Sequence, residues 1–287
     1  MSQWQLENRR FHVDINATGG ELVRIWDRQQ NVERLWRATS GIWNNSATQL
    51  FPVVGRLIHK GLWEGEHFYA LPDHGFLRHQ TFTCLAQKPD SLLIEAKATL
   101  QTLAVWPWQW RIQTAFTLHN EGISVSQQVF NDDVRPFWFS LGWHPGFSIP
   151  ITRSGWQVEF ANKPVHGPFY TRGRTLAIPE DPPETRRFPL TADGFTSGAV
   201  YFGHCQEQRV MVRSPEGRIA LTLETGQQTW LALWGVPGCD LLCIEPLAGT
   251  TDDPDFSGEV TRKRGMQSLA PGECQHFETR VCFAVDE

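Results

Sequence analysis

Two segments of the 287-residue chain place a titratable side chain among apolar residues, where it could carry out proton transfer. His144 lies between Trp143 and Pro145, so its backbone is restricted and its ring has apolar neighbours. Such surroundings orient an imidazole and readily shift its pKa. Glu245 follows the apolar run 241–244, so its carboxylate is either buried with partners or faces a cleft. A carboxylate and an imidazole together can remove one proton and deliver another.

A third candidate region consists of residues 51–57 and 71–78, which contain Arg56 and His74 beside Gly and Pro. For His74 alone, a surface turn is the favoured interpretation, because His-Gly pairs are common in loops. A structural ion pair explains Arg56 as well as substrate binding does. The alternative interpretation of Glu245 is a surface acid at the end of a strand. Residue types alone leave these alternatives open.

Composition narrows the class of partner. The formal net charge is −5, and no basic tract is present to neutralise a phosphate backbone, so nucleic acid is not expected as a partner. The chain has 13 Trp and 18 Phe but only 3 Tyr. Indole faces pack well against the C–H faces of sugar rings, which indicates a small-molecule carbohydrate partner. A Trp-rich core would give the same composition.

The sequence also indicates a compartment. No run of about 18 apolar residues is present, and the N-terminal segment lacks the apolar stretch of a secretory signal. We therefore expect a cytoplasmic protein with no membrane partner. The six cysteines are scattered and none has the paired spacing of a zinc site, so we interpret them as reduced thiols.

Hydrophobic periodicity predicts the fold class. Apolar residues alternate through 112–118 and again through 123–129, with an Asn-Glu-Gly turn between, which predicts a β hairpin. The same alternation recurs through 156–160, 219–223 and 277–283, and nothing comparable follows a helical period. We predict an all-β protein, a large sandwich with few or no helices, folded as a single domain over residues 1–287. The proline-rich stretch 163–193 is interpreted as a long surface excursion.

Five segments, in chain order and spread over most of the sequence, resemble the aldose 1-epimerase family of galactose mutarotases, most closely its shorter bacterial branch. They are FPVVGRL (51–57), PDHGFLR (72–78), WPWQWRIQTAFTL (106–118), GWHPGF (142–147) and CIEPLAGTTDDPDFSGEVTRKRGMQSLAPGE (243–273). The resemblance implies a β supersandwich, in agreement with the periodicity. It also implies interconversion of the α and β anomers of a free hexose, without cofactor or metal.

By the same resemblance, Glu245 is the general base that takes the proton of the anomeric hydroxyl, and His144 is the acid that protonates the ring oxygen. His74 assists by hydrogen bonding, and Arg56 holds a sugar hydroxyl. We also expect three residues of the matching segments to contact substrate, namely Arg78, Trp143 and Phe76.

One position departs from the family pattern. Many relatives carry an aspartate that binds sugar hydroxyls, and the expected position here is Gly198 or Ser197, with Asp193 nearby but displaced. The difference leaves the sugar open, while the acid and base remain.

Other interpretations stay open. A hexose 6-phosphate mutarotase would need added cations, for which Arg78 and Arg135 are candidates. A non-catalytic sugar-binding protein could keep the scaffold. Glu245 with the acids of segment 252–255 could form a glycosidase pair, and the two histidines with Glu245 could ligate a metal, although their sequence separations match no local ligand spacing. Either a monomer or a homodimer is compatible with the sequence.

Overall fold

Strands make up nearly all the regular structure of residues 4–284, which are the residues that the computed structural model describes. The only helical elements among them are the four-residue α1 (Leu100–Leu103) and two short 3-10 turns, η1 (Leu77–His79) and η2 (Val260–Arg262). The predicted all-β fold is therefore confirmed. None of the described residues belongs to a helix that could cross a membrane.

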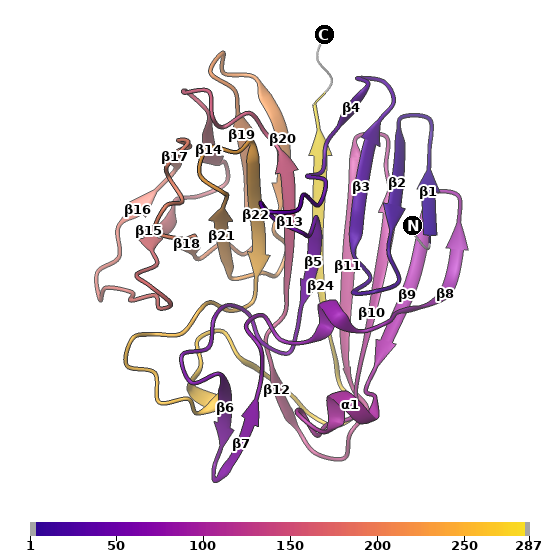
Figure 1. Cartoon of the computed structure of the whole chain (residues 1–287), viewed down its shortest axis with the longest axis vertical. Helices are drawn as coiled ribbons and strands as arrows, with labels where there is room; N and C mark the ends of the chain where they lie inside the picture. Colours follow the sequence, from indigo (N-terminus) through magenta and orange to yellow (C-terminus); the bar gives the residue numbers. More distant parts are fainter. Residues whose placement is uncertain (1–3, 285–287) are drawn as a thin grey trace.

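The larger sheet has nine antiparallel strands in the order β17-β14-β19-β20-β24-β11-β10-β9-β8 (Figure 1). Its strands, in chain order, are β8 (Thr83–Lys88), β9 (Ser91–Lys97), β10 (Trp110–Leu118), β11 (Gly122–Asn131), β14 (Gln157–Phe160), β17 (Arg187–Pro189), β19 (Arg209–Arg213), β20 (Ile219–Glu224) and β24 (Cys274–Phe283). The predicted hairpin is β10 and β11, closed by the pair Leu118 and Ile123.

The second sheet has seven strands in the order β16-β15-β18-β21-β22-β13-β5. Its strands are β5 (Ala47–Leu50), β13 (Gly142–Ser148), β15 (Val165–Tyr170), β16 (Glu184–Thr185), β18 (Val200–Gly203), β21 (Trp230–Trp234) and β22 (Leu241–Leu247). Successive residues of β22 point to opposite faces of the sheet. Leu242 and Ile244 pack in the main core, whereas Glu245 points to the opposite face and lines a cavity.

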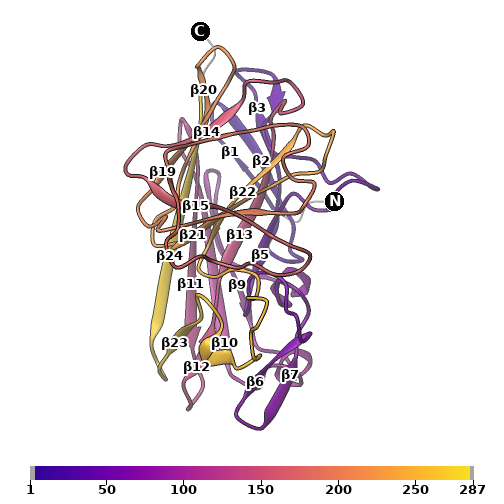
Figure 2. The same ribbon diagram turned by 90° about the vertical axis from the view of Figure 1, so that its left-hand side faces the viewer.

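Smaller sheets complete the architecture. One has the strands β1 (Trp4–Glu7), β2 (Phe11–Ile15), β3 (Leu22–Asp27) and β4 (Val32–Glu33). The two-stranded sheets are β6 (Gly61–Glu64) with β7 (His67–Ala70), and β12 (Phe137–Phe139) with β23 (Gln267–Leu269). The hairpin of β6 and β7 projects from one end of the molecule in both views (Figures 1 and 2).

The main core lies between the two large sheets, which Figure 2 shows from the side. Phe147 of β13 contacts Phe283 of β24, with ring centroids 6.2 Å apart, and Phe160 of β14 contacts Phe202 of β18 at 4.9 Å. Much of the tryptophan is core: six of these residues are almost fully buried, namely Trp4, Trp106, Trp108, Trp110, Trp143 and Trp156. Packing therefore accounts for a large part of the unusual composition.

The interpretation of residues 163–193 as a surface excursion is wrong. The segment supplies β15 and β16 to the seven-stranded sheet and β17 to the nine-stranded sheet. It buries Phe169 and Leu176 in a second, smaller apolar cluster with Tyr201. The alternation in β15 is interrupted by Gly167 and Pro168, where the pairing with β18 is irregular between His166 and Phe169. All six cysteines are free thiols.

Candidate active site

One row of residues across the seven-stranded sheet places the main candidates side by side. Thr48 of β5 pairs with His144 of β13, and the pairs on either side place His144 opposite Glu245 of β22. The row continues to Ala232 of β21 and to Tyr201 of β18. Opposed residues on neighbouring strands point to the same face of a sheet. Residues separated by about a hundred positions in sequence therefore meet at one surface.

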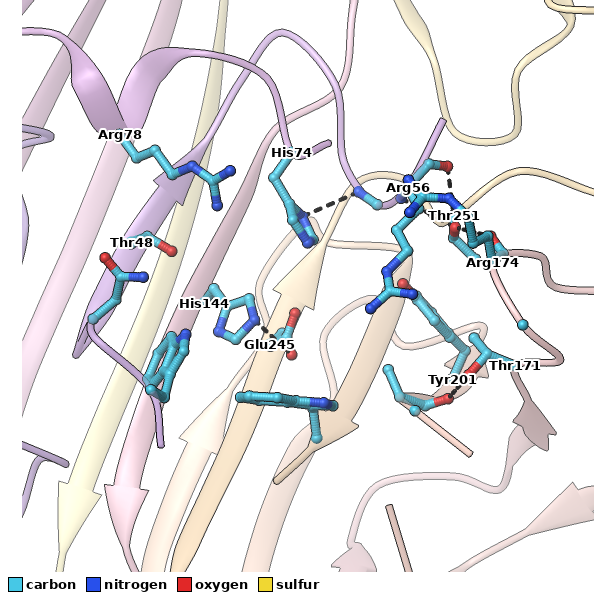
Figure 3. Close-up of a pocket in the computed structure, with 17 residues that line it drawn as sticks. Thr48, Arg56, His74, Arg78, His144, Thr171, Arg174, Tyr201, Glu245 and Thr251 are labelled. Atoms are coloured by element: carbon cyan, nitrogen blue, oxygen red, sulfur yellow. Dashed lines mark hydrogen bonds and ion pairs between the residues drawn. The ribbon is translucent and has the colours of Figure 1, made fainter. Parts of the chain in front are cut away.

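His144 and Glu245 are in direct contact. The distance from His144 Nε2 to Glu245 Oε1 is 3.2 Å, and their side chains are only 11% and 4% exposed (Figure 3). The imidazole of His144 also packs against Trp43, with ring centroids 5.0 Å apart, and against Trp234 at 6.0 Å. These indoles form an apolar wall beside the acid and base pair.

A strained turn holds His74 near this pair. His74 and Gly75 have φ values of +65° and +71°, and a side chain at Gly75 would meet the Phe51 carbonyl oxygen at 2.1 Å. The turn brings the His74 ring to 5.9 Å from that of His144. The N–H of Gly55 donates to His74 Nδ1 at 3.2 Å, so a neutral His74 carries its proton on Nε2.

The loop that carries Arg56 is tied to the chain after β22. The Arg56 N–H donates to Thr251 Oγ1, which in turn donates to the Arg56 and Arg174 carbonyl oxygens. Asp252 adds a second connection, because its Oδ2 accepts from the Ile58 N–H while its Oδ1 pairs with buried Lys263 at 2.7 Å. These bonds fix the Arg56 backbone relative to the strand that carries the carboxylate.

Together these elements enclose a cavity of about 260 Å³. Among its described lining residues, Glu245 is the only carboxylate, whereas Arg56, Arg78 and Arg174 are cationic. Arg174 is already paired with Asp73 outside the cavity, at 2.5 Å. The cavity thus combines an aromatic wall, one acid and base pair, and a rim of hydrogen-bond donors, which is the composition of a small polar-ligand site.

Burial controls the protonation of the central groups. Removal from water raises the pKa of Glu245 well above its usual value, and it lowers the pKa of His144, with His74 as a further cause. Burial and the nearby Arg78 lower the pKa of His74 to about 4. Both charged forms of the contacting pair are thus destabilised, so burial favours a pair with one proton, held by Glu245 beside a neutral His144.

The structure brings five predicted site residues to the cavity and excludes two. Arg56, His74, Arg78, His144 and Glu245 all line it. The expectation that Trp143 and Phe76 contact substrate is corrected by their placement. Trp143 adjoins His144 on a strand, so it points to the opposite face and is buried in the core. Phe76 packs in the core against Phe51 and Trp110.

Residue 198, one of the two positions at which the sequence departs from the family pattern, lies on the cavity wall. Gly198 lines the cavity with a φ of +112°, and a side chain there would meet Thr171 Oγ1 at 2.6 Å. Asp193 does not reach the cavity, and neither does Arg135, which pairs with Asp133.

Two of the acidic residues considered for a glycosidase pair form ion pairs with other residues. Asp252 is paired with Lys263, and Asp253 with Arg264, so neither forms a glycosidase pair with Glu245. In the part of the chain that the structure describes, no three His, Cys, Asp or Glu side chains gather as a metal site would require.

Several lining residues were missed by sequence reasoning, among them the aromatic residues Trp43, Trp234 and Tyr201. Trp234 is in β21, which pairs with β22, and Tyr201 is in β18, which pairs with β21. The sequence does not display these pairings, which set the face that each residue occupies. Trp43 lies in an irregular stretch, and only its aromatic type marked it.

Comparison with known proteins agrees with this architecture. The aldose 1-epimerase family model matches residues 2–281. An uncharacterized protein, YphB, of Escherichia coli is 22% identical over 95% of this chain and 96% of its own. A galactose mutarotase related enzyme from Lactobacillus acidophilus has a TM-score of 0.91 at 23% identity, covering 98% of this chain and 97% of the other.

A galactose mutarotase-like protein from Lactobacillus casei has a TM-score of 0.88 at 24% identity, covering 98% of this chain and 99% of the other. These structural likenesses show the fold, a galactose mutarotase-like sandwich. The family model spans nearly the whole sequence, including the strands that carry His144 and Glu245. The chain belongs to the aldose 1-epimerase family.

Proposed function

We propose that this protein is an aldose 1-epimerase that interconverts the α and β anomers of a free hexose. The observation that carries the proposal is the 3.2 Å contact between His144 and Glu245 on the wall of a cavity with an indole surface. Mutarotation requires one proton to be removed and one to be delivered at neighbouring oxygens. A buried pair that shares one proton suits this requirement.

The proposed reactive form is the ion pair, with Glu245 ionised and His144 protonated, which forms from the neutral pair by transfer of its one proton from Glu245 to His144. Glu245 takes the proton of the anomeric hydroxyl while His144 protonates the ring oxygen, and the bond between C1 and the ring oxygen breaks. The product is the open-chain aldehyde, and the pair now holds its proton on Glu245. Rotation about the C1–C2 bond presents the other carbonyl face, and the reverse transfers close the ring. The proton count of the pair is unchanged after each cycle.

The other lining residues would orient the sugar. The Nε2–H of neutral His74 is available to donate to a sugar oxygen near C1, because Nδ1 is occupied by the Gly55 N–H. The guanidinium of Arg56 points into the cavity and would donate to a hydroxyl (Figure 3). Trp43 and Trp234 would contact the apolar face of the ring.

Polarimetry tests the proposal directly. Freshly dissolved α-glucose and α-galactose should approach their equilibrium rotation faster with catalytic amounts of the protein than in buffer alone. A decay no faster than that of buffer would overturn the proposed activity and favour a non-catalytic sugar-binding protein. Binding of the same sugars, measured by quenching of tryptophan fluorescence, would then identify the binder.

A second candidate is mutarotation of a hexose 6-phosphate, favoured by the three arginines around the cavity. Guanidinium groups bind phosphate through paired hydrogen bonds. If phosphate is recognised, kcat/KM for glucose 6-phosphate or galactose 6-phosphate should exceed that for the free sugar, and Arg78→Gln should remove the preference. Arg135→Gln, a substitution away from the cavity, is the matched control. Equal or higher kcat/KM for the free sugars would exclude this candidate.

A further inference from the structure

Tyr201 occupies the end of the row opposite to the acid and base pair. It lies two strands from Glu245, with Ala232 between them. Neighbouring strands are about 4.8 Å apart, so the backbones at Tyr201 and Glu245 are separated by roughly 10 Å. Tyr201 lines the cavity although only 4% of the residue is exposed. A hexose with its C1 at Glu245 would extend along the row toward this phenol.

The Tyr201 hydroxyl accepts a hydrogen bond within the protein, but its own proton remains free to be donated. A hydrogen bond from the Thr251 backbone lowers the pKa of the phenol, as a donating N–H does. Burial, with the nearby Glu245, raises the same pKa overall, so the phenol keeps its proton at neutral pH. No hydrogen bond found among residues 4–284 has the Tyr201 O–H as donor. The remaining proton is available to a ligand in the cavity.

Beside Tyr201 the cavity is lined mainly by hydrogen-bond donors, and among the described lining residues the one carboxylate, Glu245, lies two strands away. Arg56 points into the cavity near Tyr201, and its guanidinium has no ion-pair partner among the described residues (Figure 3). Gly198 lines the same region, and the close approach of Thr171 leaves no room there for a side chain. A ligand oxygen bound between Tyr201 and Arg56 can therefore act as an acceptor.

We propose that Tyr201 is a specificity-determining residue whose O–H donates to a hydroxyl oxygen of the sugar at C3 or C4. These ring positions lie across from C1 and the ring oxygen, which the proposed function places at His144 and Glu245. The inference rests on that proposed function. Tyr201 takes no part in proton transfer, so its contact contributes equally to the bound sugar and to the transition state.

The test combines one enzyme change with one substrate change. Tyr201→Phe removes the donor and keeps the ring, and Tyr170→Phe, on an exposed side chain of β15, is the matched control. Kinetics are measured with the hexose and with its 3-deoxy and 4-deoxy analogues. Loss of one neutral hydrogen bond predicts that Tyr201→Phe lowers kcat/KM for the hexose about fivefold to tenfold, mainly through KM. The control should match the wild type.

The deoxy analogue that lacks the contacted hydroxyl should be turned over equally by the wild type and Tyr201→Phe. A variant as active as the wild type on the hexose, or one that loses the same factor on every analogue, would overturn the role of Tyr201. Sugar Kd values, from tryptophan fluorescence, repeat the comparison without turnover. If the wild type binds sugars but does not epimerise them, the proposed function fails and the Kd comparison still decides on Tyr201. A wild type that neither binds nor epimerises any of them overturns both.

Discussion

His144 and Glu245 show how burial can create a reactive pair. Either group alone would be costly to keep charged away from water. In contact at 3.2 Å, they can exist as an ion pair or as a neutral pair with one shared proton. Burial destabilises both charged forms and so reduces the advantage that the ion pair would have in water. The neutral pair and the ion pair hold the same single proton, so transfer between the two partners converts one form into the other without a proton from solvent.

Glu245→Gln should abolish this exchange while preserving the fold. Glutamine has nearly the same shape but cannot accept the proton of the anomeric hydroxyl. We expect the rate of mutarotation, followed by polarimetry, to fall at least about 100-fold. Circular dichroism should remain that of the wild type. Glu180→Gln, on an exposed side chain, is the control. A Glu245→Gln rate within threefold of the wild type would contradict the assignment.

His144→Asn should separate catalysis from binding. The asparagine amide can still donate to Glu245 but cannot deliver a proton to the ring oxygen. We expect kcat to fall about 100-fold or more, with only a modest change in sugar affinity measured by fluorescence quenching. An unchanged kcat would remove His144 from the acid role. A parallel loss of affinity and rate would instead assign it to substrate binding.

At the scale of elements, alternation predicted the strands better than it predicted the site. The inward positions of β10 are buried as expected, because each strand has a period of two. The same period of two explains why Trp143 does not line the cavity. If His144 faces the cavity, its neighbour on the strand must face the core. The positions of Trp234 and Tyr201 could not be predicted, since they depend on the register of β21 against β22 and of β18 against β21.

The loop after β22 contains a buried ion pair between Asp252 and Lys263, which gives an element-scale prediction. Lys263→Met leaves the Asp252 carboxylate buried without its cation, and we expect the free energy of unfolding to fall by about 3–5 kcal/mol. Asp252→Asn combined with Lys263→Met should recover most of this loss, because the amide oxygen can still accept from the Ile58 N–H. Urea denaturation measures both. A double variant no more stable than Lys263→Met would show that the charge pair itself stabilises the loop.

At the scale of the whole molecule, the buried site couples stability to pH. The pKa of His74 is about 4 in the folded protein, against an ordinary value of 6.5. Below pH 6.5 the unfolded chain binds this proton first, so stability falls with pH until the folded protein also binds it near pH 4. Buried His144 contributes with the same sign. Glu245 contributes with the opposite sign, because its raised pKa lets the folded protein bind a proton first.

His74→Asn isolates the contribution of one group. Asparagine does not titrate, and its side-chain oxygen can replace Nδ1 as the acceptor for the Gly55 N–H. From the shift of His74, we expect the wild type to lose about 3 kcal/mol more than the variant between pH 7 and pH 4. Urea denaturation at a series of pH values gives both curves. Parallel curves would mean that His74 already titrates normally in the folded protein, and the lowered pKa inferred for it would be wrong.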